Sequence, residues 1–360
     1  MTKQLYVIGD IHGRLDLLKQ SLEIAGIIDK TSNWIKKDTV LVQLGDIIDR
    51  GPHSLKNILF LAKLAKQAQQ YNSSVEVMLG NHELMAIFAG MGNNYAKFHW
   101  FFNGGDWVYK EWSDKKNCQS PVPEIFYNEF SPERSYGQII SQYKVAFKHS
   151  GNLFVHGGII GENRSIRQLN KILHQTFANK SKHLYEKDIF SRTGPFWIRN
   201  FSEQALAEQC EEYDVKRQIV GHTPKMGLEI SQNGKLVYAD LGMNQNQMPF
   251  IIEIDNSHIK LKINNDQKKL PLGEDGIMKV VSKEKNYPFT KPKYDIGDLI
   301  DLFITEDGDF NVQLKILNII KDEKIIWYAG EFIFNDNGKR FVKVGKWPIG
   351  HVDKHGIKLS

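Results

Sequence analysis

Short apolar, β-branched runs alternate with helical patterns over the first 255 residues of the chain. After a polar start at Ser54, apolar residues recur from Leu55 to Ala65 at the spacing of one helix face. Alternating strand and helix patterns are typical of a sheet with crossover helices, so this region predicts an α/β fold. The predicted strands are 5–8, 39–44, 75–79, 153–156, 218–220, 236–239 and 250–254.

The pattern changes near the C-terminus, where long β-rich runs are separated by polar turn sequences such as Asp307-Gly308 and Asn337-Gly338. Such turns between strands are typical of hairpins, which predicts a small all-β, barrel-like domain over residues 294–360. The predicted strands of this domain are 299–305, 310–320, 324–334 and 340–347.

Residues 256–293 carry nine Lys against four acidic residues, a surplus equal to the +5 of the whole chain. Arg and aromatic residues are scarce in this stretch, which disfavours nucleic-acid binding. We therefore expect a solvated, Lys-rich connector between a domain at 1–255 and the domain at 294–360.

Length and composition agree with a globular protein of about two domains. The chain has 360 residues, of which 41% are hydrophobic and 25% charged. No apolar run approaches the roughly 18 residues of a membrane span, and the N-terminus lacks a secretory signal pattern. The two cysteines, Cys118 and Cys210, form no CxxC motif. These features predict a cytoplasmic protein, with specialised secretion into a host cell as the alternative.

Polar residues beside glycine follow successive predicted strands. Each block alone is typical of a turn or a helix cap. Together they bring carboxylate, amide and imidazole groups to the ends of strands, and these groups are ligands for Mn, Fe and Zn. The sequence therefore predicts a dinuclear metal site. The blocks are Gly9-Asp10-Ile11-His12-Gly13, Gly45-Asp46-Ile47-Ile48-Asp49-Arg50-Gly51, Gly80-Asn81-His82-Glu83, Val155-His156-Gly157-Gly158 and Gly221-His222-Thr223.

The ordered set GDIHGR, GDIIDRG, GNHE, HGG and GHTP resembles the calcineurin-like metallophosphoesterases, specifically bacterial-type members of their phosphoprotein phosphatase branch, from residue 5 to about 255. The resemblance implies a β-sandwich with flanking helices and two divalent ions, with Mn²⁺ expected and Fe or Zn as alternatives. It implies a hydroxide held by both metals as the nucleophile. The implied ligands are Asp10 and His12 for one ion, Asn81, His156 and His222 for the other, and Asp46 for both.

The same resemblance implies roles for the residues around the metals. His82 would be the general acid, with Asp49 orienting its imidazole. Arg50 and Asn81 would bind the substrate phosphate, Arg50 by the bidentate geometry that guanidinium allows.

A second phosphate-binding arginine is expected after His156. The segment 194–200 lacks the Trp-Ser-Asp-Pro of eukaryotic members and resembles the Trp-x-Arg of bacterial-type relatives. This resemblance implies Arg199 as the second phosphate-binding arginine, with Arg192 as the alternative. The insert at about 84–150 is expected to cap the site and to carry substrate choice. Its aromatic run 99–102 either lines a substrate cleft or packs in the core, and core packing is favoured.

The expected function is metal-dependent hydrolysis of phosphoserine and phosphothreonine on proteins. Hydrolysis of dinucleoside polyphosphates and a phosphotyrosine-directed activity are the alternatives. A binding protein with a dead site is disfavoured, because every expected ligand is present. A phosphoprotein substrate is the expected partner, the C-terminal β domain is a possible docking module, and neither nucleic acid nor a membrane span is expected.

Overall fold

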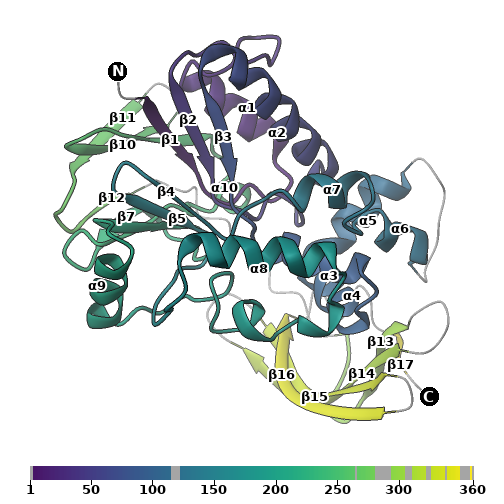
Figure 1. Ribbon diagram of the computed structural model, residues 1–360. Helices are drawn as coiled ribbons and strands as arrows, with labels where there is room; N and C mark the ends of the chain where they lie inside the picture. The colour runs from purple at the N-terminus through teal and green to yellow at the C-terminus, as the bar shows by residue number, and fades with distance from the viewer. Residues whose placement is uncertain are drawn as a thin grey trace.

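The computed structural model describes residues 3–114, 122–263, 266–279, 293–304, 310–321, 326–336, 339–348 and 357–358. Within these ranges the chain forms two six-stranded sheets, with helices around them, and a separate five-stranded sheet (Figure 1). None of the helices in this part of the chain is both long and apolar enough to cross a membrane.

The first sheet has the strand order β11-β10-β9-β1-β2-β3. Its strands β1, β2 and β3 are parallel and β9 is antiparallel to β1. The inner strand β2 is buried along its whole length, as expected for a parallel strand covered on both faces. Helix α1 packs against β9 and helix α2 against β3. The bounds are β1 (Gln4–Ile8), α1 (Leu15–Ile24), β2 (Thr39–Gln43), α2 (Ser54–Ala68), β3 (Ser74–Val77) and β9 (Phe250–Ile254).

The second sheet has the order β12-β7-β8-β6-β5-β4, in which β5, β6 and β8 are parallel. Helix α8 packs on β4 and crosses the front of this sheet in Figure 1. The bounds are β4 (Ala146–His149), β5 (Asn152–Val155), α8 (Ile166–Ala178), α9 (Glu203–Glu212), β6 (Arg217–Val220), β7 (Gly227–Ser231), β8 (Leu236–Tyr238) and α10 (Met243–Asn246).

The residues of the expected insert are largely helical. They follow β3 and form a group of short helices at one side of the two sheets (Figure 1). Helix α4 continues through a π-helical turn, η2, into α5. The bounds are α3 (Asn81–Gly90), α4 (Asn94–Trp100), η2 (Phe101–Gly105), α5 (Asp106–Ser113), α6 (Glu124–Asn128) and α7 (Ser135–Ile140).

Residues 256–263 and 266–279 of the expected connector are described by the structure. They contribute β10 (His258–Ile263) and β11 (Asp266–Pro271) to the first sheet and β12 (Gly276–Lys279) to the second, so this part of the segment belongs to the sheets. The Lys count hid a period-two alternation: Ile259 and Leu261 are buried, while the ammonium of Lys260 between them lies 3.0 Å from the Glu253 carboxylate of β9. Lys260 and Lys262 both form ion pairs with Glu253 of the neighbouring strand and lie on the same face of β10.

The C-terminal region is an antiparallel sheet of order β16-β15-β14-β13-β17, as its hairpin pattern predicts. No pairing of β16 with β17, which would close a barrel, occurs in the described ranges. Side chains such as Ile300, Leu314 and Tyr328 are buried. The bounds are β13 (Leu299–Ile304), β14 (Phe310–Lys321), β15 (Ile326–Asp336), β16 (Lys339–Pro348) and β17 (Ile357–Lys358).

Candidate active site

Metal-ligating side chains gather where strands of both sheets end. The loops after β1, β2, β5 and β6 carry candidate ligands, and α3 begins after β3. Two groups of three side chains could each hold a metal ion, because the ligand atoms within a group lie within 4.8 Å of one another. Asp46 belongs to both groups. One group is His12, Asp46 and His82, and the other is Asp46, His156 and His222. The structure therefore places one carboxylate between two sets of imidazoles.

Hydrogen bonds to backbone carbonyls orient the imidazoles. The Nδ1 atom of His12 donates to the carbonyl of Ile48 at 3.0 Å, and that of His156 donates to the carbonyl of Leu44 at 2.7 Å. Each bond fixes the tautomer and leaves Nε2 with its lone pair toward the site.

The amide of Asn81 completes the second group. Its Oδ1 atom lies 2.9 Å from Nε2 of His156, and Oδ1 of Asp46 lies 3.3 Å from the same nitrogen. Because Nδ1 of His156 already donates to Leu44, these are acceptors that face one another in a buried space. A divalent cation would satisfy all of them, so the residues fit a metal of the Mn, Fe or Zn class.

The Asp10 carboxylate is hydrogen-bonded to the backbone of another candidate ligand. Its carboxylate accepts the backbone N–H of His222 at 3.1 Å, and it is absent from both ligand groups. Burial, then Asp240 and Asp46, raises the pKa of Asp10 well above its ordinary value. The structure thus brings Asp10 to the site beside Asp240, which sequence analysis did not single out.

Burial keeps the site in a state that suits cation binding. It lowers the pKa of His156 to about 4 and the pKa values of His12 and His222 well below their ordinary range, so these imidazoles are neutral. It also raises the pKa of Asp46 to about 6, although Arg50 opposes this. A bound cation would stabilise both the neutral imidazoles and the charged form of the buried Asp46 carboxylate.

The backbone around the site is held in unusual conformations. Positive φ angles occur at His12, Asp46, Asp49, Arg50 and His222. Non-glycine residues in this region are strained by about 1 kcal/mol or more and cluster at functional sites.

Close packing of the loops also requires glycine at one point. Gly45 has a φ of 96°, and a Cβ there would lie 2.5 Å from the backbone nitrogen of Gly80. The loop after β2 therefore touches the start of α3, so the candidate ligands of the two segments lie close together.

The carboxylate of Glu83 joins the same two segments. It accepts the backbone N–H groups of Asp46, Ile47, Ile48 and Gly80 at 2.8–3.1 Å and is fully buried. The motif contained this residue, but nothing in the sequence revealed four donors from two loops.

A second constellation surrounds His82. Its Nδ1 atom is hydrogen-bonded to Oδ2 of Asp49, and the other oxygen of Asp49 accepts Nε1–H of Trp100 at 2.9 Å. The Arg50 guanidinium donates to Nε2 of His82 at 2.9 Å and to Nε2 of His12 at 3.0 Å. The motifs indicated the pairing of Asp49 with His82, but no pattern in the sequence marked Trp100 as their neighbour.

The two candidate phosphate-binding arginines have different surroundings. Arg199 donates to the carbonyl of His222, and Asp46 and Asp10 oppose the lowering of its pKa by burial. Arg192 is committed elsewhere, because its Nε donates to Glu186 at 2.8 Å and its guanidinium lies 4.4 Å from the ring centre of Trp197. The geometry favours Arg199 as the group that faces the metal ligands.

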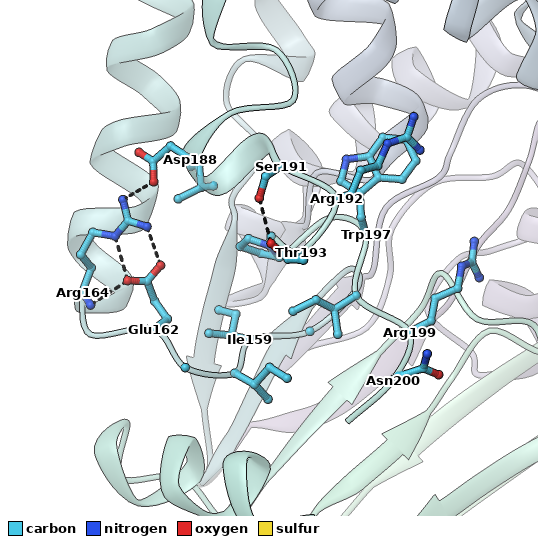
Figure 2. A pocket seen from close by; sticks show the side chains of 17 residues that line it. Ile159, Glu162, Arg164, Asp188, Ser191, Arg192, Thr193, Trp197, Arg199 and Asn200 are labelled. Carbon is cyan, nitrogen blue, oxygen red and sulfur yellow. Dashed lines mark hydrogen bonds and ion pairs between the residues drawn. The ribbon is translucent and has the colours of Figure 1, made fainter. Parts of the chain in front are cut away.

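A cavity of about 700 Å³ adjoins this arginine. Figure 2 shows Arg199 and Trp197 on one side and the Arg164 side chain, bonded to Glu162 and Asp188, on the other. The hydroxyls of Ser191 and Thr193, 3.2 Å apart, lie between them. Of the residues discussed above, Arg199, Arg192 and Trp197 line this cavity, and the candidate metal ligands do not.

The aromatic run 99–102 mainly packs in the core, as favoured. Trp100 is fully buried against Phe126 and Phe130. His99 instead stacks on Trp197 with 5.7 Å between ring centres, which ties α4 to the segment that lines the cavity. Of the two cysteines, Cys210 is buried, and Cys118 lies outside the described residues.

Buried His and Asp groups at the ends of strands from both sheets define a candidate metal centre. The sequence profile of the calcineurin-like phosphoesterases matches residues 3–226. The chain belongs to this family, whose members use a dinuclear divalent metal centre, and is thus a phosphatase of the metallophosphoesterase type.

Individual relatives agree with this membership. Shewanella-like protein phosphatase 2 of Arabidopsis thaliana is 26% identical over 70% of this chain and 75% of that protein. Shewanella-like protein phosphatase 1 of Plasmodium berghei is 27% identical over 84% of this chain and 82% of that protein. The crystal structure of a cold-active protein-tyrosine phosphatase from a psychrophilic Shewanella species has the same fold, with a TM-score of 0.64 and 22% identity over 75% of this chain and 81% of that chain.

Proposed function

We propose that the protein hydrolyses phosphoserine and phosphothreonine on proteins with two Mn²⁺ ions. The observation that carries the proposal is the Asp46 carboxylate shared by two groups of metal-ligating side chains, next to the His82–Asp49 pair. The similarity to proteins named protein phosphatases over 70% and 84% of the chain supports a protein substrate.

In this proposal Asp10, His12 and Asp46 would hold one metal, and Asp46, Asn81, His156 and His222 would hold the other. Two bound cations would lower the pKa of a coordinated water and would bind the phosphate oxygens.

The protein's own residues then orient the substrate and supply a proton. Arg50, Arg199 and the Asn81 amide bind phosphate oxygens. His82 gives a proton from Nε2 to the leaving alkoxide, while Asp49 holds Nδ1–H. Burial, followed by Arg50, lowers the pKa of His82 well below its ordinary value. A phosphate dianion bound beside Arg50 and His82 would oppose that effect and favour the protonated imidazole.

Turnover on matched phosphoserine, phosphothreonine and phosphotyrosine peptides and on diadenosine tetraphosphate, with Mn²⁺ and after chelation, tests the proposal. We expect metal-dependent release of phosphate from the first two peptides. Cleavage of the phosphotyrosine peptide alone would transfer the assignment to a tyrosine-directed enzyme. Cleavage of the dinucleotide alone would contradict a protein substrate.

The C-terminal sheet is proposed as a docking module for the substrate protein. Leu317 of β14 and Val342 of β16 support this role. Both are apolar, yet their exposed fractions are 48% and 53%. Leu317→Asp should lower kcat/KM on a phosphoprotein and leave hydrolysis of a small aryl phosphate unchanged. An unchanged kcat/KM of Leu317→Asp on the phosphoprotein would contradict docking through Leu317.

A further inference from the structure

The carboxylate of Asp49 has a different donor on each oxygen. Its Oδ2 bonds with the imidazole of His82, and its Oδ1 accepts the indole N–H of Trp100 at 2.9 Å. All three residues are no more than 1% exposed, so water does not compete for these bonds. The orientation of the carboxylate is therefore set by two side chains, one from α3 and one from α4.

The position of Trp100 is itself tightly determined. Its ring stacks on Phe126 with 5.3 Å between centres and meets the edge of Phe130 at 4.7 Å. A Cβ on Gly105 would approach Nε1 of Trp100 to 3.0 Å. The aromatic cluster and the turn after α4 thus hold the indole N–H against Asp49.

The same turn also supports Arg50. The backbone N–H of Arg50 donates to the carbonyl of Gly104 at 3.3 Å, and a Cβ on Gly104, whose φ is 118°, would lie 2.8 Å from Cγ of Arg50. The end of α4 and the following π-helical turn therefore lie directly behind Asp49 and Arg50. This part of the insert is a support for the catalytic groups, in addition to any role as a cap.

We propose that Trp100 is a positioning residue that orients the His82 general acid through Asp49. The inference rests on the proposed phosphomonoesterase function. Without the indole N–H, Oδ1 of Asp49 has no donor in a dry pocket, and the neighbouring Arg50 guanidinium competes for the carboxylate. The imidazole then loses the partner that holds its Nδ1–H, and proton transfer from Nε2 is misdirected.

The test uses Trp100→Phe, which keeps an aromatic ring and removes the N–H. Because only a poor leaving group requires protonation, kcat on phenyl phosphate should fall by about 10- to 100-fold, the range for loss of an outer hydrogen-bond partner. Hydrolysis of 4-nitrophenyl phosphate should change much less. Equal losses on both substrates would overturn the inference, since a general structural defect lowers both.

A control variant separates the hydrogen bond to Asp49 from the loss of a buried indole bond elsewhere in the chain. Trp34 is also fully buried, and its Nε1–H donates to the carbonyl of Lys36 at 2.6 Å, so Trp34→Phe removes an equivalent bond away from the site. This variant should keep the wild-type ratio of the two rates. If Trp34→Phe changes the ratio as much as Trp100→Phe does, the effect does not depend on Asp49 and the inference is contradicted.

A readout independent of turnover keeps the two proposals distinguishable. In protein loaded with diamagnetic Zn²⁺, the proton between His82 and Asp49 should give a downfield resonance that is absent in His82→Ala. This resonance should move upfield or vanish in Trp100→Phe and persist in Trp34→Phe. If the wild-type protein hydrolyses neither the aryl phosphates nor the phosphoserine and phosphothreonine peptides, the proposed function fails. An unchanged resonance in Trp100→Phe would separately overturn the positioning role.

Discussion

Asp46 is the residue whose replacement most directly tests the dinuclear centre. Its Oδ2 atom lies 3.7 Å from Nε2 of His12, and its Oδ1 atom lies 3.3 Å from Nε2 of His156. No other residue belongs to both ligand groups of the described structure. Asp46→Asn keeps the shape of the side chain but removes its charge, so it should weaken both metal sites, whereas His12→Ala should weaken one.

The expected size follows from linkage between metal binding and folding. Metal at about 1,000 times its dissociation constant stabilises a folded protein by about 4.1 kcal/mol per site. If loss of the shared charge weakens binding about 100-fold, the ratio falls to about 10 and the stabilisation to about 1.4 kcal/mol. We therefore expect the metal-induced gain to fall by about 2.7 kcal/mol at each site.

Urea unfolding of each protein with and without Mn²⁺ measures this gain, and calorimetric titration of chelator-treated protein gives the stoichiometry. Asp49→Asn is the matched control, because Asp49 is equally buried and adjacent but belongs to neither ligand group. It should retain both metals and lose turnover. Two ions bound to Asp46→Asn with wild-type affinity would refute the shared-ligand reasoning.

Three further predictions concern single side chains. His82→Ala should lower kcat on phosphoserine peptides by about 10² to 10⁴ and much less on activated aryl phosphates, and a leaving-group series measures this. Arg199→Ala should raise the inhibition constant of inorganic phosphate by about tenfold or more, and Arg192→Ala should change it little, because Arg192 is held by Glu186. Ser165→Ala removes the capping box of α8 and should lower the free energy of unfolding by about 1 kcal/mol, measurable in urea. Equal inhibition constants for the two arginine variants would contradict the second prediction. An unchanged free energy of unfolding in Ser165→Ala would contradict the third.

The fold was predictable where hydrophobic periodicity is local. The strand patterns of residues 1–255 correspond to β1, β2, β3, β5, β6, β8 and β9, and the C-terminal hairpin pattern corresponds to β13 to β16. The missed strands include β7 and β10 to β12, which carry exposed or ion-paired side chains. Lys260 and Lys262 of β10 look like a solvated segment until Glu253 of the next strand is placed beside them. Charged strands near a sheet edge carry a weak sequence signal.

The candidate site divides in the same way. Its motif residues follow strand ends, so their order along the chain predicts that they gather at one edge of the sheets. The four backbone N–H groups that donate to Glu83, and the contact of Asp10 with Asp240, depend on how loops meet after folding. Such contacts join positions as far apart as 230 residues in the chain, and no local pattern records them.

By itself, the sequence determined the metallophosphoesterase family, the α/β class and the order of the candidate ligands, because these depend on short motifs and on the period of buried residues. The tertiary structure alone decided which groups share Asp46, that Arg199 and not Arg192 lies beside His222, and that Trp100 touches Asp49 across 51 positions. The physical reason is that each of these is a contact between separate elements, and its geometry is set by how their buried faces pack together.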